Sequence, residues 1–359
     1  MSKEFTYAEA GVDRELRAKS KESLEKLKQL YRFGKYGEPI ELPYGKILPY
    51  KDRFIDAIIE GIGTKVLLAQ LAGKYDTIGI DGVAMAVNDL VRQGSDTMFI
   101  LDNIDAEKSD PHLIEGWMKG IMKGAEQAET LVLNGEIADV ADLIKGVKKG
   151  EGFHMIVAAV GDLYEKEIIW GKGIKPKDVI IGARSSGQHS NGISLTRKVL
   201  FKRWGGYYLD PFVKLDELEK ELVLEVLEPT QIYVNPVLEA NNEYEIKAAV
   251  HITGDAHAKF DKLLPYNPGI GFVFNDLRPQ PIFKVIQETA KKLGRKITDE
   301  EMLKTYNMGD GFDLVVSPSE KDGVISIFEK YGIDAWQVGY VNKSGRIIAH
   351  YNGKEMTLN

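Results

Sequence analysis

A Gly-rich turn between a strand-like run and a helix-like run is the feature that most constrains how this sequence can fold. Residues 54–59 are mostly apolar and rich in β-branched Ile, residues 66–72 favour a helix, and the turn between them reads Glu60-Gly61-Ile62-Gly63-Thr64-Lys65. Backbone amides gather where such a strand gives way to a helix N-terminus, and that geometry binds phosphate. The turn departs from a Walker A loop and from a dinucleotide fingerprint, so a plain surface turn is an open alternative.

A helix with one polar side follows the turn. At 100° per residue, Asp81, Met85, Asn88 and Asp89 fall on one side and apolar residues fall on the other. A solvated face is the ordinary interpretation of such a pattern. Further carboxylates lie at the ends of apolar segments, and this density favours a magnesium–phosphate site, because Mg²⁺ prefers hard oxygen ligands. The acidic residues of this set are Glu60, Asp81, Asp89, Asp102 and Glu136.

A second polar loop follows a strand-like run at residues 179–183 and leads into a helix that runs through Leu200. Its amides and hydroxyls, with the helix N-terminus, could bind an anion, and His189 could serve as a donor. The alternative is a simple N-cap at Ser190 or Asn191. The run that ends in His251-Ile252-Thr253-Gly254 has the same form, but a lone His at such a place is more often structural.

Composition narrows the possible partners. The chain of 359 residues carries a net charge of -7, which disfavours nucleic acid and anionic membrane surfaces as partners. It has no Cys, which removes disulfides and thiolate catalysis and fits a reducing cytoplasm. No apolar leader follows Met1 and no run approaches the roughly 20 apolar residues of a membrane span. We therefore expect a cytoplasmic protein.

Strand-like and helix-like segments alternate along the whole chain, which predicts an α/β or α+β protein of two domains. We expect an N-terminal arm or lid over residues 1–50, a first domain over 51–168 and a C-terminal α/β domain over 169–359. The charged, Gly-containing passage at 164–178 predicts the boundary between the two domains. Other expected helices lie at 16–31, 114–129, 214–228 and 231–242.

Taken together, these segments resemble one family, the phosphoribosylformylglycinamidine cyclo-ligases, also called aminoimidazole ribonucleotide (AIR) synthetases. The family belongs to a wider superfamily of AIR synthase-related enzymes that use ATP. The resemblance covers nearly the whole chain in order, and the start YAEAGVD at residues 7–13 separates the cyclo-ligases from the rest of the superfamily. The other segments that carry it are EGIGTK, DTIGIDGVAMAVNDLV, LNGEIAD, HSNGISLTRK, LEPTQIYV, HITG and KTYNMGDGF.

The resemblance implies a reaction and an assembly. The reaction is ATP-dependent closure of the imidazole ring of formylglycinamidine ribonucleotide in purine biosynthesis, through phosphorylation of the formyl amide oxygen, with release of ADP and phosphate. The implied cofactors are ATP and Mg²⁺. The implied assembly is a homodimer in which two N-terminal mixed sheets, which bind ATP and magnesium, pair into a shared β-barrel. A C-terminal mixed sheet flanked by helices would complete each chain.

The resemblance also implies roles for the candidate residues. Lys65, Asp89 and His189 are the expected catalytic residues, and Glu60, Asp81 and Asp89 are the expected metal ligands. The residues expected to bind ATP and its metal are Gly61, Gly63, Thr64, Lys65, Asp81, Asn88, Asp102 and Glu136. The residues expected to bind the substrate are Ser186, His189, Ser190, Asn191, Gly192, Thr253 and Gly254.

Several positions depart from the family pattern. Glu60 stands in place of an Asp, Asn134 and Ile137 in place of a Gly and a Thr, and Asp255-Ala256 in place of two glycines. The Gly-rich loop of the family is reduced at residues 43–46, so how the N-terminal arm closes over a ligand is not evident from the sequence. The charged groups are kept, which indicates a divergent branch.

Two kinds of alternative stay open. One is a related enzyme, namely thiamine-phosphate kinase, selenophosphate synthetase or a hydrogenase-maturation dehydratase. The missing Cys counts against the last two, and the AGVD start counts against the kinase. The other alternative is a nucleotide-binding subunit without activity, which the retained acids and Lys65 disfavour.

Overall fold

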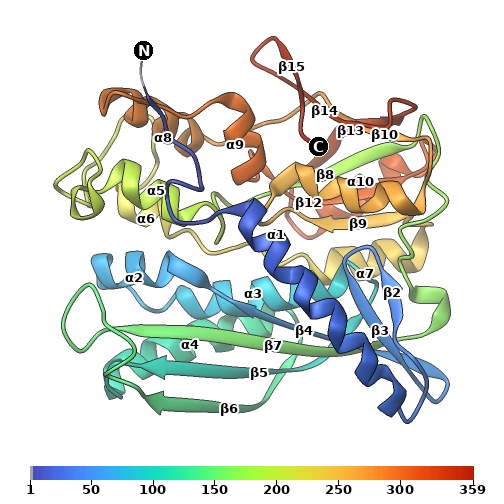
Figure 1. The fold of residues 1–359 in the computed structure, drawn as a ribbon, viewed down its shortest axis with the longest axis horizontal. Helices are drawn as coiled ribbons and strands as arrows, with labels where there is room; N and C mark the ends of the chain where they lie inside the picture. Colours follow the sequence, from blue (N-terminus) through green and yellow to red (C-terminus); the bar gives the residue numbers. More distant parts are fainter. Residues whose placement is uncertain (1–2) are drawn as a thin grey trace.

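Two mixed β-sheets, each packed against helices, are stacked one above the other (Figure 1). The computed structural model describes residues 3–359. The chain passes from the lower sheet to the upper one between Leu163 and Val179. Two mixed sheets flanked by helices agree with the two-domain α+β fold expected from the sequence.

The N-terminal sheet has six strands and one partly exposed face. Its strand β7 (Phe153–Leu163) alternates at every residue between buried and half-buried side chains, as a strand with only one covered face does. Only β5 and β6 run parallel to each other. In spatial order the strands are β2 (Ile40–Leu42), β3 (Gly45–Tyr50), β4 (Arg53–Gly61), β7, β5 (Asp96–Ala106) and β6 (Leu131–Asp139).

Helix α3 (Ile78–Val91) is the centre of the molecule, because all of its residues are buried. It packs on β7 and β4, beside α4 (Pro111–Gln127), and against α7 (Val234–Glu243) of the other domain. A Cβ at Gly79 would lie 2.3 Å from the amide N of Ile121, so the glycine lets α3 and α4 approach closely. The solvated helix face considered above is therefore wrong, since both sides of α3 are covered.

Capping and turn residues determine where two helices near α3 begin. Helix α4 begins after Asp110, whose side chain accepts a hydrogen bond from the amide of His112, and Pro111 occupies its first turn. The Gly-rich turn becomes a short 3-10 helix, η2 (Gly63–Lys65), followed by α2 (Val66–Ala72). Both helices were expected from the sequence.

The C-terminal sheet has seven strands, and three of them, β9, β10 and β12, are buried along their whole length. In spatial order the strands are β15 (Lys354–Thr357), β14 (Ile347–Tyr351), β10 (Gly271–Phe274), β13 (Ala335–Asn342), β8 (Val179–Arg184), β12 (Asp310–Val316) and β9 (Ala248–His251). The helices around them are α5 (Ile193–Leu200), α6 (Leu222–Val226), α7 (Val234–Glu243), α8 (Pro281–Lys292), α9 (Asp299–Thr305) and α10 (Lys321–Lys330). The 3-10 helices are η3 (Glu165–Glu167), η4 (Lys202–Trp204) and η5 (Ala256–Tyr266). Of the helix expected at 214–228, only α6 forms.

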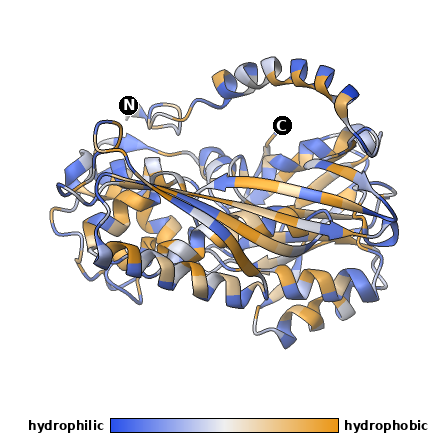
Figure 2. Ribbon diagram, turned by 90° about the horizontal axis from the view of Figure 1, so that it is seen from below, coloured by the Kyte–Doolittle hydropathy of each residue, from blue (hydrophilic) through white to orange (hydrophobic). Residues whose placement is uncertain are grey.

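The N-terminal segment crosses from one domain to the other. Strand β1 (Lys3–Glu4) pairs with β11 (Arg295–Lys296) on the C-terminal domain, and α1 (Arg14–Glu22) and the 3-10 helix η1 (Ser23–Phe33) then lead to the N-terminal sheet. These helices stand away from the body as an arc at the top of Figure 2. Strands β2 and β3 belong to the sheet itself, so an arm that extends to residue 50 is wrong for residues 40–50. No helix of residues 3–359 is long and apolar enough to cross a membrane.

Candidate functional site

Lys65 and Asp81 form a fully buried ion pair at the first turn of α3. Lys65 Nζ donates to Asp81 Oδ1 at 2.8 Å and to the carbonyl oxygen of Glu228 at 2.6 Å. The same Oδ1 accepts from the amide and the hydroxyl of Thr230, at 2.8 and 2.7 Å, and from the Ser190 hydroxyl at 3.0 Å. Asp81 Oδ2 is buried and has no hydrogen-bond partner among the described residues. One carboxylate oxygen therefore joins the two domains, and the other is available to a cation.

Asp89 occupies the last turn of the same helix in a cationic setting. Its Oδ1 lies 2.8 Å from His251 Nδ1 and 2.8 Å from Arg92 Nη1. Burial acts to raise the pKa of Asp89, but Arg92, His251 and the more distant Lys259 outweigh it and hold that pKa below its usual range. Asp89 is therefore a carboxylate at neutral pH. Burial also lowers the pKa of His251, although Asp89 opposes the shift.

Two further ionisable groups face this end of α3. Glu60 ends the inner face of β4, and burial and the charge of Asp89 raise its pKa to about 6. Lys259 Nζ donates to the carbonyl oxygen of His251 at 3.1 Å and to the hydroxyl of Thr253. Burial lowers the pKa of Lys259 to about 8, and Asp89 acts in the opposite direction. Such a cluster of shifted groups at a domain junction is typical of a functional site.

The three expected metal ligands lie in two places. Asp81 and Asp89 are two helical turns apart, which separates their Cα atoms by about 12 Å. Asp81 contacts Lys65, whereas Glu60 is influenced by Asp89. A single ion cannot touch both ends of α3, so a magnesium-bound phosphate chain would have to extend along the helix.

His189 lies in the loop that faces α3 from the C-terminal domain. Its Nε2 accepts hydrogen bonds from the amides of Ser186 and Gln231, at 3.2 and 3.4 Å. Burial lowers the pKa of His189 well below its usual range, so the ring is neutral and its proton sits on Nδ1. Nδ1 is buried without a hydrogen-bond partner in the part of the chain that the structure describes. This N–H group is therefore a donor that a ligand can use.

The residues after His189 bring the loop against the 251–254 turn. Gly192 begins α5 with a φ of 71°, and a Cβ there would lie 2.3 Å from the Tyr306 ring, so only Gly fits. The buried side-chain nitrogen of Asn191 has no hydrogen-bond partner within residues 3–359, and the oxygen of the same side chain would lie 3.7 Å from a Cβ at Gly254. The structure thus brings the expected substrate residues together.

Most of the other residues expected to bind ATP lie either on α3 or in the Gly-rich turn before it. Asn88 donates to the carbonyl oxygen of Gln231 at 2.8 Å and accepts from the amide of Tyr233 at 2.9 Å, so it ties α3 to the loop of the other domain. The Thr64 hydroxyl lies 3.1 Å from the Ser194 hydroxyl, at the start of α5. Gly63 in the same turn has a φ of 69° and open space around it, whereas Gly61 lies at the exposed end of β4.

Two expected acids lie apart from the others. Asp102 is opposite Val157 and Gly135 in the sheet, and no charged neighbour contributes to its pKa, which burial alone raises. Glu136 is exposed on the edge strand β6. The structure therefore gathers the residues of α3 and both loops but not these two strand residues.

Four residues that the sequence interpretation did not assign to the site contribute to it: Arg92, Thr230, His251 and Lys259. His251 was treated as structural, yet it contacts Asp89 directly. Arg92 follows Asp89 by three residues, which on a helix places them together, so spacing could have found it. Thr230 lies in the LEPTQIYV segment and could have been found from that resemblance. Lys259 gives no local signal.

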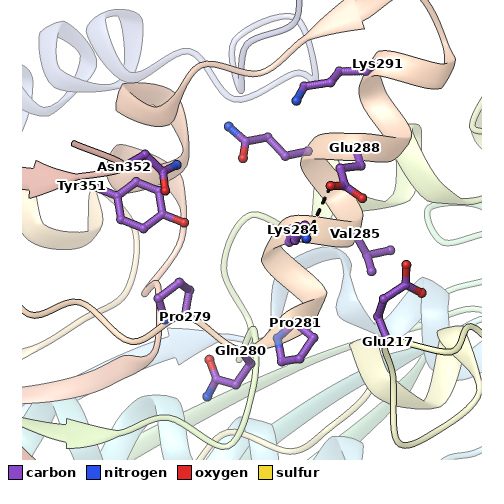
Figure 3. Close-up of a pocket in the computed structure, with 11 residues that line it drawn as sticks. Glu217, Pro279, Gln280, Pro281, Lys284, Val285, Glu288, Lys291, Tyr351 and Asn352 are labelled. Atoms are coloured by element: carbon purple, nitrogen blue, oxygen red, sulfur yellow. Dashed lines mark ion pairs between the residues drawn. The ribbon is translucent and has the colours of Figure 1, made fainter. Parts of the chain in front are cut away.

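A surface cavity of about 560 Å³ lies elsewhere. It is formed by α8 and the turn around Tyr351 on the C-terminal domain (Figure 3). None of the expected site residues lines it. The ionic groups of α3 are instead closed between the domains, with Lys65 and Asp81 out of contact with solvent.

Comparisons with known proteins support the resemblance. The models of two families, "AIR synthase related protein, N-terminal domain" and "AIR synthase related protein, C-terminal domain", match residues 51–162 and 175–352. A phosphoribosylformylglycinamidine cyclo-ligase from Pyrococcus horikoshii is 35% identical over 94% of this chain and 96% of its own. Those from Methanocaldococcus jannaschii and Bacillus cytotoxicus are 35% and 36% identical, over 98% and 97% of this chain and 99% and 97% of theirs.

Solved structures show the same fold at lower identity. The HypE-HypF complex contains a chain with a TM-score of 0.60 and 17% identity, and the match covers 87% of this chain and 92% of that one. Thermotoga maritima PurL complexed with ATP gives a TM-score of 0.57 at 15% identity, over 87% of this chain and 45% of the other. These likenesses concern the fold alone.

Proposed function

We infer the function from one premise, that this chain belongs to the phosphoribosylformylglycinamidine cyclo-ligase family of AIR synthase-related proteins. We propose that it closes the imidazole ring of formylglycinamidine ribonucleotide with ATP, in purine biosynthesis. The observation that carries the proposal is the junction between the domains. There, the charged ends of α3 face the polar loops at 189–192 and 251–254. The names of the relatives favour this reaction over that of a related small-molecule kinase.

The first chemical step makes a leaving group. The formyl amide oxygen attacks the γ-phosphorus of ATP, the bond from that phosphorus to ADP breaks, and the oxygen becomes phosphorylated. Catalysis of such a transfer rests on positioning and on neutralising charge. Lys65 and Thr64 are the residues that we propose for the ATP phosphates. The buried Nδ1–H of His189, which has no partner in the described chain, would donate to a phosphate or formyl oxygen.

The second step closes the ring. The nearby amidine nitrogen attacks the activated carbon, the carbon–oxygen bond breaks, phosphate leaves with the bonding electrons, and the nitrogen loses a proton. A neutral His189, a lysine with a pKa of about 8 at Lys259 and a carboxyl with a pKa of about 6 at Glu60 lie around this junction. The polar loops and the buried interface would hold the substrate and exclude water.

The residues present fit a magnesium ion. Asp81 Oδ2 is a buried carboxylate oxygen without a hydrogen-bond partner among the described residues, and Glu60 has a pKa raised partly by the charge of Asp89. A cation would give Asp81 Oδ2 a partner, and it would offset the repulsion between the charges of Glu60 and Asp89. We propose that Glu60 and Asp89 hold magnesium at one end of α3 and Asp81 at the other. Bound there, the metal would neutralise charge on the phosphates.

A homodimer would cover the exposed edge of the N-terminal sheet. Strand β6 is an edge strand whose first six residues are exposed, and Leu133 is 59% accessible. On the neighbouring outer face, Ile59 is 68% accessible. Long exposed edges with apolar side chains are sites of pairing with another chain. We propose that two copies pair these sheets into a shared barrel, and sedimentation of wild type and Leu133→Glu would test it, with a monomeric wild type as the contrary result.

We also propose a first domain at residues 51–168, to which the strands at 40–50 are added, a second domain at 169–359, and a cytoplasmic location, where ATP is available to the reaction. The decisive experiment incubates the protein with ATP, Mg²⁺ and formylglycinamidine ribonucleotide. We expect aminoimidazole ribonucleotide with one ADP and one phosphate for each product molecule. ADP formation with thiamine phosphate alone, and none with formylglycinamidine ribonucleotide, would overturn the assignment in favour of the related kinase.

A further inference from the structure

Behind the candidate site, three buried side chains converge in the core of the C-terminal domain. They are His257 on η5 and Asp310 and Asp313 on β12, and none is accessible to solvent. One ligand atom from each lies within 4.8 Å of the other two. Because β12 has an irregularity between Asp310 and Phe312, the two aspartates reach the same side of the strand.

The hydrogen bonds of this cluster are incomplete. His257 Nε2 lies 3.1 and 3.0 Å from the two carboxylate oxygens of Asp310. Both carboxylate oxygens of Asp313 are buried, and no N–H or hydroxyl donor of residues 3–359 reaches them; their polar neighbour is the carboxyl group of Asp310, with which Asp313 can share a proton. Since buried polar atoms are nearly always paired, two orphaned oxygens on one side chain indicate a ligand that binds there.

The charge of the cluster is also uncompensated. No Lys or Arg of the described chain forms an ion pair with Asp310 or Asp313. His257 is the one basic side chain that contacts the two carboxyl groups among the described residues, and all three side chains are closed to solvent. A buried carboxylate must be paired, bind a metal or take up a proton. Burial and the neighbouring Asp310 raise the pKa of Asp313, so the choice lies between a metal ion and a shared proton.

We propose that His257, Asp310 and Asp313 bind one divalent transition-metal ion of the zinc or manganese class. The atoms are placed for it: ligand atoms at roughly 2.0–2.2 Å from one ion lie about 3–4.5 Å apart, which spans the separations in the cluster. One imidazole nitrogen and two carboxylates suit zinc or manganese better than magnesium, which keeps several waters.

The site is separate from the magnesium ligands on α3. Gly311, next to Asp310, is so close to His189 that a Cβ there would lie 2.6 Å from His189 Cε1. The metal would thus fix β12 directly behind the loop that carries His189, tying that strand to η5. Because the cluster is closed to solvent, the ion would be bound as the chain folds and would stay with the purified protein.

The test is the metal content of the full-length protein, without an affinity tag that binds metal. It is expressed with zinc and manganese in the medium, purified without nucleotide, dialysed against metal-free buffer and analysed by plasma mass spectrometry. We expect about one zinc or manganese ion for each chain. We also expect the metal content per chain to fall at least tenfold in Asp313→Asn. It should be unchanged in Asp56→Asn, which alters a buried aspartate of the other domain.

Two further measurements keep the test decisive. Asp89→Asn must retain the ion, because a loss there would place it in the site on α3. Unfolded wild type is also refolded with zinc or with a chelator, and we expect the denaturant midpoint to be higher with zinc, which does not depend on any variant folding. A metal-free wild type, or equal metal content in wild type, Asp313→Asn and His257→Gln, would overturn the proposal and leave a proton shared between the aspartates.

Discussion

Asp89 is the residue whose chemistry depends most directly on its neighbours. Arg92 and His251 both contact it, and they keep it ionised in a buried position. A carboxylate held in this way is pre-organised, because its charge is fixed before any ligand arrives. Its contribution to activity can therefore be separated from its contribution to folding.

Replacing Asp89 by Asn should lower kcat by about 100-fold or more while the protein stays folded, because the charge is lost and the shape is kept. Steady-state kinetics and circular dichroism measure the two effects. The matched control is Asp56→Asn, a buried carboxyl that accepts from Gln93 and Ser95 within the N-terminal sheet. Near-normal activity in Asp89→Asn would remove this residue from the site.

Glu60 should give the pH profile of the enzyme an acidic limb, in which activity falls as the pH is lowered. Its pKa of about 6 means that it is protonated below that pH and ionised above it, and only the ionised form binds a cation. The value of kcat/KM, which reports on the free enzyme, should therefore rise with pH through about 6 and then level off. Glu60→Gln should abolish this limb and lower the plateau. A limb that persists unchanged in Glu60→Gln would assign it to another group.

At the scale of the element, the start of α5 is fixed by a glycine. Gly192 combines a left-handed backbone with close contact to the Tyr306 ring, and this geometry sets the direction of the loop that carries His189 and Ser190. The loop then reaches Asp81 across the domain junction.

Gly192→Ala should destabilise the protein by about 2–4 kcal/mol, since a strained φ and a steric clash add. Gly205→Ala is the control, because Gly205 has a φ of 89° but nothing within 4 Å of a Cβ, so it should lose only about 1–2 kcal/mol. Denaturant unfolding measures both. Equal losses in the two variants would show that the Tyr306 contact is unimportant.

Elements were predictable where the signal is local. The Asp110-Pro111 start of α4 and the strand–turn–helix around Lys65 follow from capping, turn chemistry and periodicity. Strands β2 and β3 were missed because Gly and Pro residues interrupt that segment, while pairing with β4 decides its structure. The family resemblance identified the candidate loops. It could not show that Lys65 is paired with Asp81, nor that His257 meets Asp313, because these contacts join residues far apart in the sequence.

At the scale of the whole molecule, a few hydrogen bonds fix the position of one domain relative to the other. Asn88 makes two of them, to the backbone of Gln231 and Tyr233. Because both bonds are made by one side chain of α3, the position of that helix determines where the loop of the other domain lies.

Asn88→Ala should cost about 2–4 kcal/mol, because it leaves a buried carbonyl and a buried amide unpaired. It should also reduce kcat, since the loop at 228–233 supports Lys65 and Asp81. Asn235→Ala, which removes an exposed contact to Glu129, should change stability by less than about 0.5 kcal/mol. A loss in Asn88→Ala no larger than that of the control would contradict this account.

The chain crosses between the domains twice, once through α1 and η1 and once between Leu163 and Val179. Two covalent crossings define an axis, so the domains can rotate about the line that joins them far more easily than they can slide or twist. A rotation of this kind would separate α3 from the loops at 189–192 and 251–254, which the hydrogen bonds of Asp81 and Asp89 now hold against it.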